Sequence, residues 1–339
     1  MSCLIQFIRM FKGRFMKLKF ISFSLIILLA AVLSACQPQT ATPAPVENTA
    51  APVPTATPAP IVENPIVLGD ISDDPAEVIE GAQPVADYLA EQLKDYGITS
   101  GQVRVAASIE EMTELLRSGE VDLYFDSTYP ATLISDETGA KIILRRWKFG
   151  VEKYNAVIFA SKESGITSIE QLKGQIIVMD APYSTSGYLL PAVHLMENGL
   201  TLSGKQDYNQ PVAEDEVGFV FSYDDENTLQ WVLNGFASAG VVDDYRFDVA
   251  FPADVTANLV VLARTETSPR QIGIASATLD EPLIEAIKTA LIGMDETEAG
   301  QAALENFLTT KFDEFPEGID VAVKRMREMM ETVQSIQLP

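Results

Sequence analysis

The stretch Gln175-Ile176-Ile177-Val178-Met179-Asp180-Ala181-Pro182-Tyr183-Ser184-Thr185-Ser186-Gly187-Tyr188 decides the fold of this chain. Its first five residues form a short apolar run, which predicts a buried strand. The residues from Leu189 to Met196 have helical periodicity, so a hydroxyl-rich loop joins a strand to a helix. The first N–H groups of a helix lack partners inside it and carry partial positive charge. This arrangement therefore suits a small anion.

The hydroxyl groups of this loop allow two interpretations. Ser184, Thr185 and Ser186 would donate hydrogen bonds to an oxyanion, and Gly187 would let it approach the backbone closely. Alternatively, the three residues are an ordinary N-cap cluster, because Ser and Thr are preferred at helix starts. The local sequence leaves both interpretations open. Pro191 lies beyond the first turn, so we expect it to kink the helix.

The N-terminus has the features of an export signal. Residues 1–35 carry five cations and no acid, and an apolar run from Phe20 to Val32 precedes Leu33-Ser34-Ala35-Cys36. A basic region, a short apolar region and small residues before a cut are typical of a signal peptide. The last four residues resemble a bacterial lipobox, which implies lipidation of Cys36. Translation starts at Met1 or at Met16, and the sequence leaves this open.

Residues 36–64 predict a semi-rigid tether, because they are rich in Pro, Thr, Ala and Val. The whole chain of 339 residues has a net charge of −24. Without the five cations of the signal, 19 Lys and Arg face 48 Asp and Glu, which leaves −29. This excludes a nucleic-acid partner. A buried cradle for a small anion remains possible, because distant surface charges are screened.

The remaining composition excludes several kinds of site. Cys3 and Cys36 are the only cysteines and both belong to the signal, so the exported domain has no disulfide. The single histidine, His194, excludes a His-rich metal site and a Ser-His-Asp hydrolase. We therefore expect no metal and no cofactor. Asp224-Asp225-Glu226 predicts an acidic helix start.

The globular part alternates predicted strands with predicted helices, which indicates parallel βαβ units. About 275 residues suffice for two lobes. We expect the first lobe to hold residues 65–156 and 258–339 and the second to hold 157–257, with crossovers near Val157–Ala160 and Val249–Leu259. A ligand in such an α/β fold binds at the carboxyl ends of the strands.

Four segments carry a family resemblance. They are Gln83-Pro84-Val85-Ala86-Asp87-Tyr88-Leu89, Leu116-Arg117-Ser118-Gly119-Glu120-Val121-Asp122 followed by Tyr129, Tyr154 to Ile166, and Leu172-Lys173-Gly174 followed by Asp180 to Pro191. In this order they resemble the phosphate/phosphite/phosphonate substrate-binding proteins of ABC importers, from about Leu68 to Val333. The resemblance implies the α/β type II periplasmic-binding-protein fold, whose two lobes close on a tetrahedral oxyanion in the cleft.

The resemblance also implies site residues. Ser184, Thr185 and Ser186 would hold the ligand oxygens, Tyr154 would donate from the other lobe, and Tyr129 is a further candidate.

Other positions depart from the family pattern. Where the family has Gly-Ser-His, this chain has Ser222-Tyr223-Asp224, and Tyr223 donates but cannot become charged. Where aminophosphonate binders place acids, this chain offers Tyr245, with Asp243 and Asp244 beside it, and Gln271, next to Arg270. This argues against an aminophosphonate and for a plain oxyanion or its organic ester. Either one of Arg145 and Arg146 assists the binding of an anion, or both are surface charges.

These observations favour a monomeric, membrane-anchored lipoprotein outside the cytoplasm that hands a phosphorus oxyanion to an ABC permease. The alternative is a ligand sensor of the same fold, or one that binds a different small anion. An exported enzyme is disfavoured, because no nucleophile–base pair is apparent.

Overall fold

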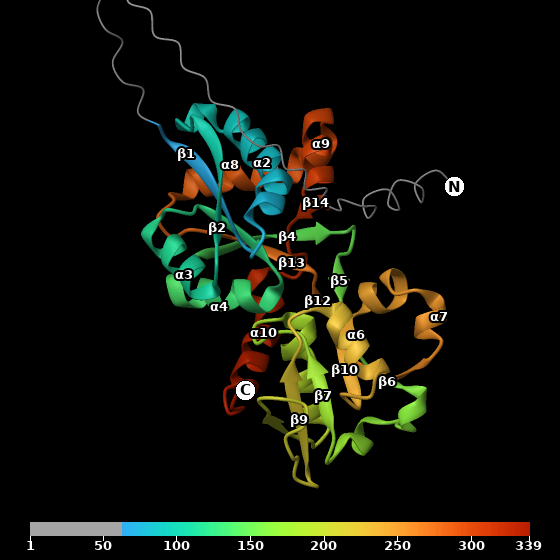
Figure 1. Ribbon diagram of the computed structural model, residues 1–339. Helices are drawn as coiled ribbons and strands as arrows, with labels where there is room; N and C mark the ends of the chain where they lie inside the picture. The colour runs from blue at the N-terminus through green and yellow to red at the C-terminus, as the bar shows by residue number, and fades with distance from the viewer. Residues whose placement is uncertain (1–62) are drawn as a thin grey trace, which may run out of the picture. The chain divides into compact units, whose positions relative to one another are not determined.

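A computed structural model describes residues 63–339 (Figure 1). The predicted signal peptide, Cys36 and residues 37–62 of the predicted tether lie outside the described residues. The described part contains two six-stranded sheets and one two-stranded sheet. Within residues 63–339, no helix is both long enough and apolar enough to span a bilayer.

The first lobe is built on a sheet with strand order β14-β4-β13-β3-β1-β2. Its strands are β1 (Pro65–Ile71), β2 (Ser100–Ala106), β3 (Leu123–Asp126), β4 (Lys141–Lys148), β13 (Gln271–Ala275) and β14 (Thr309–Asp313). Its helices are α2 (Pro75–Gln92), α3 (Ile109–Ser118), α4 (Thr128–Thr138), α8 (Glu281–Ile292) and α9 (Glu298–Asn306). The predicted parallel pairing is present between β1 and β2 and between β1 and β3, whereas β13 runs antiparallel to both of its neighbours.

The second lobe has a sheet with strand order β11-β6-β10-β7-β9-β8. Its strands are β6 (Ala156–Ser161), β7 (Ile176–Met179), β8 (Thr201–Gly204), β9 (Glu216–Phe221), β10 (Ala239–Asp243) and β11 (Leu259–Arg264). Its main helices are α5 (Leu190–Glu197), α6 (Asp225–Leu233) and α7 (Ala253–Thr256), with π-helical segments η4 (Thr185–Leu189) and η5 (Arg246–Ala250). β7 lies inside this sheet and is buried throughout, as its apolar sequence predicts.

The chain crosses between the lobes at a two-stranded sheet, β5 (Lys153–Tyr154) with β12 (Ser268–Pro269). β6 already belongs to the second sheet, and β11 pairs antiparallel with β6. The expected crossovers near Val157–Ala160 and Val249–Leu259 are therefore displaced. Residues 259–264, which the sequence analysis assigned to the first lobe, form an edge strand of the second. An apolar run predicts a strand but does not say which sheet it joins.

Helix boundaries follow local signals. Asp74 caps α2 by accepting a hydrogen bond from the Glu77 N–H at 3.3 Å, and Pro75 occupies the start of the helix. Ser108 caps α3 in the same way, and α3 ends at Gly119 with φ of 76°. These signals bound α2 and α3, which connect the parallel strands β1, β2 and β3.

The C-terminal helix α10 (Ile319–Val333) joins the cores of both lobes. Its Val323 packs in a first-lobe cluster with Ala131 and Ile134. Further along, Met326 and Val333 pack in the cluster that contains the second-lobe residues. The helix is therefore shared between the lobes rather than belonging to the first alone.

Arg145 and Arg146 are buried, so neither is the surface charge that the sequence left possible. The Arg145 guanidinium donates to Asp313 at 3.0 and 2.7 Å and to Glu152 at 2.6 Å. The Arg146 guanidinium donates to Thr309 at 2.8 Å and lies 3.4 Å from the centre of the Phe307 ring. Both residues thus attach β4 to the segment that carries β14.

Candidate functional site

The loop between β7 and α5 is held by bonds between its own two ends. The Gly187 N–H donates to Ser184 Oγ at 3.0 Å, so Ser184 is an N-cap, as one interpretation of the sequence proposed. The Asp180 N–H donates to the Gly187 carbonyl at 3.1 Å. The loop is therefore a closed turn in which Gly187 uses both of its backbone polar groups.

Pro191 explains why the Gly187 carbonyl accepts no hydrogen bond from the helix that follows. In a regular α-helix, the N–H of residue 191 would donate to the carbonyl of Gly187, four residues earlier. Proline has no N–H, and the chain forms the π-helical segment η4 before α5 instead. The Gly187 carbonyl is therefore available to accept the hydrogen bond from the Asp180 N–H. Pro191 stands at the start of α5 rather than in its interior, where the sequence analysis expected it to produce a kink.

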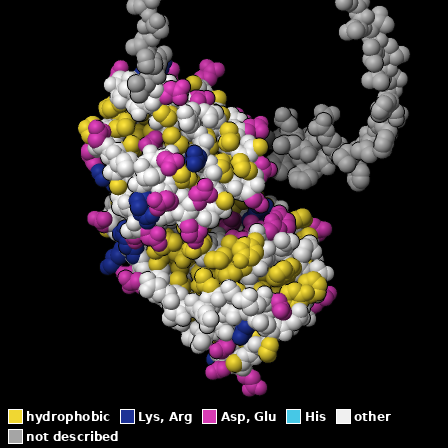
Figure 2. Space-filling model, turned by 60° about the vertical axis from the view of Figure 1, so that its left-hand side comes forward, with side chains coloured by type: hydrophobic (Ala, Val, Ile, Leu, Met, Phe, Trp, Pro, Cys, Tyr) yellow, Lys and Arg dark blue, Asp and Glu magenta, His cyan; other side chains and the backbone are white. Residues whose placement is uncertain are grey.

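A cavity of about 160 Å³ lies between the lobes at this loop. Its lining comes from segments far apart in the chain: Ser127, Tyr154, Asp180, Ser184, Ser186, Gly187, Asp225, Asp243 and Arg270. In Figure 2 a hollow separates the two halves of the described domain, and acidic and basic side chains gather in it. Most of the lining residues follow the carboxyl ends of strands or lie near the interlobe crossings. This is where α/β folds place their ligands.

The hydroxyl groups of the cavity come from both the loop and the crossing strand β5. Ser186 is 8% exposed and Tyr154 is 1% exposed. Burial raises the pKa of the Tyr154 phenol, while the charge of Arg270 and hydrogen bonds with Thr185 and Ser186 act in the opposite direction. Tyr154 thus lines the same cavity as Ser184 and Ser186 of the loop.

Thr185 connects the lobes instead of lining the cavity. It is completely buried, and its Oγ1 accepts a hydrogen bond from the Tyr129 N–H at 2.9 Å. Tyr129 contributes this backbone N–H, while its ring packs in the apolar cluster that includes Tyr188. Neither residue lines the cavity. Both hold α4 of the first lobe against the loop of the second.

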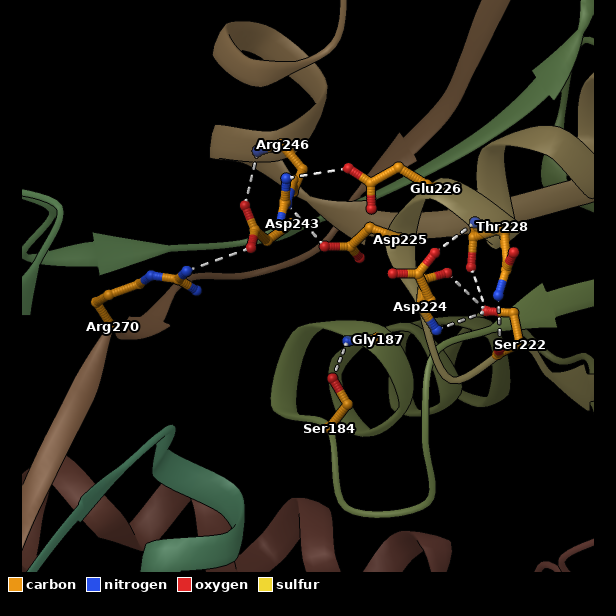
Figure 3. A network of polar contacts seen from close by, with 11 residues as sticks. Ser184, Gly187, Ser222, Asp224, Asp225, Glu226, Thr228, Asp243, Arg246 and Arg270 are labelled. Atoms are coloured by element: carbon orange, nitrogen blue, oxygen red, sulfur yellow. Dashed lines mark hydrogen bonds and ion pairs between the residues drawn. The ribbon is translucent and has the colours of Figure 1, made fainter. Parts of the chain in front are cut away.

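The charged side chains of the cavity are mostly acidic. Figure 3 shows Asp225, Asp243 and Arg270 converging above the turn that carries Ser184 and Gly187. Arg270 Nη2 lies 3.4 Å from Asp243 Oδ2, and Arg246 Nε lies 2.9 Å from Asp225 Oδ2. Burial raises the pKa of Asp180, which a hydrogen bond with Ser184 partly offsets. Three carboxyl groups therefore line the cavity beside one guanidinium.

Known proteins show what this arrangement resembles. A family model described as the periplasmic substrate-binding protein of phosphonate ABC transporters matches residues 71–317. This match covers well over half of the chain. The chain belongs to this family. It is accordingly a substrate-binding transport protein rather than an enzyme, and the family implies a small ligand, a permease partner and a place outside the cytoplasm.

Solved structures agree on the type II periplasmic-binding-protein fold. XAC2383 from Xanthomonas citri bound to chloride ion is 26% identical with a TM-score of 0.73, over 79% of this chain and 97% of that one. XAC2383 bound to ATP is 24% identical with the same TM-score, over 79% and 96%. PhnD1 from Prochlorococcus marinus in complex with methylphosphonate is 17% identical with a TM-score of 0.60, over 80% and 98%.

Two residues of this phosphonate-family protein that were expected to donate to the ligand, Tyr223 and Gln271, do not line the cavity. The Tyr223 side chain is 70% exposed, and its backbone N–H donates to the Asp180 carbonyl at 2.8 Å. Gln271 is buried in β13, and its Oε1 has no hydrogen-bond partner among the described residues. Neither side chain lines the cavity. Tyr245, the other departure from the family pattern, stacks on Phe149.

Sequence reasoning did not select four of the lining residues, Ser127, Asp180, Asp225 and Asp243. Asp180 directly follows β7, Asp243 ends β10 and Ser127 directly follows β3. Their places at strand ends were a usable signal, because these ends meet at one edge of each sheet. Asp224 is the N-cap of α6, as predicted, and accepts from the Asn227 N–H at 2.8 Å. Among residues 63–339, no group of His, Cys, Asp and Glu could hold a metal ion.

The partly buried aspartates of the cavity predict a pH dependence of stability. Burial, with the charge of Asp180 second, raises the pKa of Asp225 to about 7. The folded chain therefore keeps a proton that the unfolded chain releases above about pH 4. The stability that this proton contributes is complete below about pH 4 and is lost as the pH rises through about 7.

We therefore expect the melting temperature of Asp225→Asn, relative to that of the unmodified chain, to rise as the pH is raised from 5 to 8. Thermal unfolding measured at several pH values checks this expectation. Asp224→Asn is the matched control, because Asp224 is the neighbouring carboxylate of the same helix start. A constant difference between Asp225→Asn and the unmodified chain over this pH range would contradict the prediction.

Proposed function

We propose that this protein binds a small organophosphonate that carries an amine and delivers it to an ABC permease. The phosphonate oxygens would accept hydrogen bonds from the hydroxyls of Ser186 and Tyr154, whereas the Ser184 hydroxyl is bonded to Asp180 and Gly187. The start of the helical segment η4 adds a positive partial charge on the same side. Arg270, which lines the cavity, supplies the full positive charge that a phosphonate requires.

The amine is inferred from the charge of the cavity. Asp180, Asp225 and Asp243 all line it, and only one guanidinium lines it with them. A dianion alone would be repelled by those of the three carboxyl groups that are ionised, and above about pH 7 these include Asp225, although Arg246 pairs with it at 2.9 Å. An ammonium group on the ligand would balance them. This is the single observation that distinguishes the proposal from plain phosphate or phosphite binding.

The sequence argument against an aminophosphonate rested on Tyr245 and Gln271 in place of acids. That argument loses its basis, because neither residue lines the cavity and Asp243 does. Asp243 lies two positions before Tyr245, and we propose that it faces the amine of the ligand.

The attachment to the membrane is part of the same proposal. Lipidation of Cys36 would anchor the protein, and the segment up to residue 64 would hold the binding domain away from the membrane surface. A monomer is sufficient for this role, because one chain contributes every residue of the cavity.

Calorimetric titration of the full-length chain in detergent tests the ligand class. The panel is phosphate, phosphite, methylphosphonate, 2-aminoethylphosphonate and sulfate. We expect 2-aminoethylphosphonate to bind most tightly. Ser186→Ala should weaken this binding by about 10- to 100-fold, since a hydrogen bond to a charged group contributes about 1.5–3 kcal/mol.

Ser203→Ala is the matched control, because Ser203 lies in β8 of the same lobe and does not line the cavity. It should bind as the unmodified chain does. Equal affinity for all five anions, or a preference for phosphate, would refute the amine part of the proposal. The absence of binding across the panel would refute the proposal as a whole.

A further inference from the structure

An exposed aromatic residue bridges the lobes beside the cavity. Phe149 follows β4 in the first lobe and is 41% exposed. Its ring stacks on that of Tyr245 in the second lobe, with centres 5.4 Å apart and planes inclined by 8°. Stacked rings at this distance attract each other beyond their buried area. The pair therefore exists only when the two lobes approach each other at this edge.

The backbone of Phe149 is held in an unfavourable conformation. Its φ is 58°, in the left-handed region that non-glycine residues adopt rarely. The Phe149 N–H donates to the Leu308 carbonyl at 2.7 Å, and Leu308 also has a positive φ, of 52°. Glycine would fit position 149 without this strain. Residues whose surroundings hold them in a strained conformation commonly serve a function. At position 149 this indicates a function for the aromatic ring of Phe149.

The stack lies next to the charged contact of the cavity. Tyr245 is two residues from Asp243, which pairs with Arg270. The guanidinium carbon of Arg270 is 5.8 Å from the centre of the Phe149 ring and 4.4 Å from that of Tyr154. Arg270 Nε is buried and has no hydrogen-bond partner among the described residues. Aromatic rings thus take the place of hydrogen bonds in orienting this guanidinium.

We propose that the Phe149–Tyr245 stack is a clasp that positions Arg270 and keeps the lobes closed over a bound ligand. The inference rests on the proposed function for the identity of that ligand. A contact that holds the lobes together over the ligand has to break before the ligand can leave, so it slows release more than it slows association. Phe149 is thus a positioning residue that sets how long the ligand stays bound.

Stopped-flow fluorescence with 2-aminoethylphosphonate on the full-length chain tests this. Phe149→Ala should raise the dissociation rate constant about 10-fold and change the association rate constant by less than about 2-fold. Phe149→Tyr should restore slow dissociation, because it keeps the ring. If the role of Phe149 were purely structural, Phe149→Ala would lower both ligand occupancy and stability. It would not change the dissociation rate constant separately from the association rate constant.

The chain provides a matched control. Phe236 is 48% exposed and stacks on Tyr208, with ring centres 5.2 Å apart, in a contact within the second lobe alone. Phe236→Ala should leave both rate constants unchanged. The clasp is overturned if Phe149→Ala dissociates no faster than the unmodified chain, or if Phe236→Ala accelerates dissociation equally.

A second measurement does not depend on the ligand. Cysteines are introduced as Phe149→Cys and Tyr245→Cys in a chain that also carries Cys3→Ser and Cys36→Ser. We expect a short thiol–thiol crosslinker to join the pair within one chain. If it does not, the clasp is wrong even where binding is intact. If the pair crosslinks but no panel anion binds, the proposed function fails and the interlobe contact stands.

Discussion

Gly187→Ala is expected to lower the affinity for 2-aminoethylphosphonate by about 100-fold or more, equivalent to about 2.7 kcal/mol. A Cβ at position 187 would lie 2.3 Å from Asp180 Cβ and 2.7 Å from Ser184 Oγ. The neighbours would have to move, because real Cβ atoms do not approach other atoms so closely. That movement would break the bonds that close the loop, Gly187 N–H to Ser184 Oγ and Asp180 N–H to the Gly187 carbonyl.

The substitution should lower both binding and stability, so the two are measured separately. The loop is at the surface of the cavity, and overpacking typically costs about 1–3 kcal/mol of stability. Calorimetric titration gives the affinity and thermal unfolding gives the stability. Gly293→Ala is the control, because a Cβ at that position would have no atom within 4 Å. Unchanged affinity in Gly187→Ala would show that the closed turn of this loop is not needed for binding.

The central loop could be predicted because its signals are local. An apolar run, three hydroxyl residues, a glycine and a helical period all lie within about 20 residues of one another, and each favours the same strand–loop–helix unit. The family resemblance then related Tyr154 to this loop. The structure brings Tyr154 and Ser186 to one cavity. Thr185, which has the same chemistry, instead accepts a bond from Tyr129 across the lobes.

The acids of the cavity could not be predicted in the same way, because their positions depend on where strands end. Side chains alternate between the faces of a strand, and the last residue of a strand is free to reach the cleft. Asp243 is the last residue of β10, and Tyr245 lies outside that strand and reaches Phe149 instead. An inference about the ligand that rests on Tyr245 therefore differs in charge from one that rests on Asp243, which lines the cavity.

Local sequence signals also could not locate the boundary between the lobes. The segments 259–264 and 271–275 both read as strands of similar apolar character. One pairs with β6 in the second sheet and the other with β3 and β4 in the first. The two residues that mark the crossing, Ser268 and Pro269, form a ladder with β5 that is too short to leave a periodic pattern.

Asp243→Asn is expected to invert the ligand preference of the protein. Removing one partner of a buried charge pair typically costs about 2–5 kcal/mol, so we expect binding of 2-aminoethylphosphonate to weaken by about 100-fold. Methylphosphonate has no amine and should bind as well as before or more tightly. The variant lowers the negative charge of the cavity and frees Arg270, whose Nη2 lies 3.4 Å from Asp243 in the unmodified chain.

The ratio of the affinities for 2-aminoethylphosphonate and methylphosphonate, measured by calorimetry at pH 8, isolates the contribution of the amine to binding. Loss of fold or of the loop geometry would weaken both ligands together, whereas loss of an ammonium partner weakens only one. Asp244→Asn is the matched control, because the Asp244 carboxylate accepts from the Asn155 side chain at 2.8 Å and does not line the cavity. If Asp243→Asn weakens both phosphonates equally, Asp243 acts by orienting Arg270 for the oxyanion. The charge of the cavity would then no longer argue for an amine on the ligand.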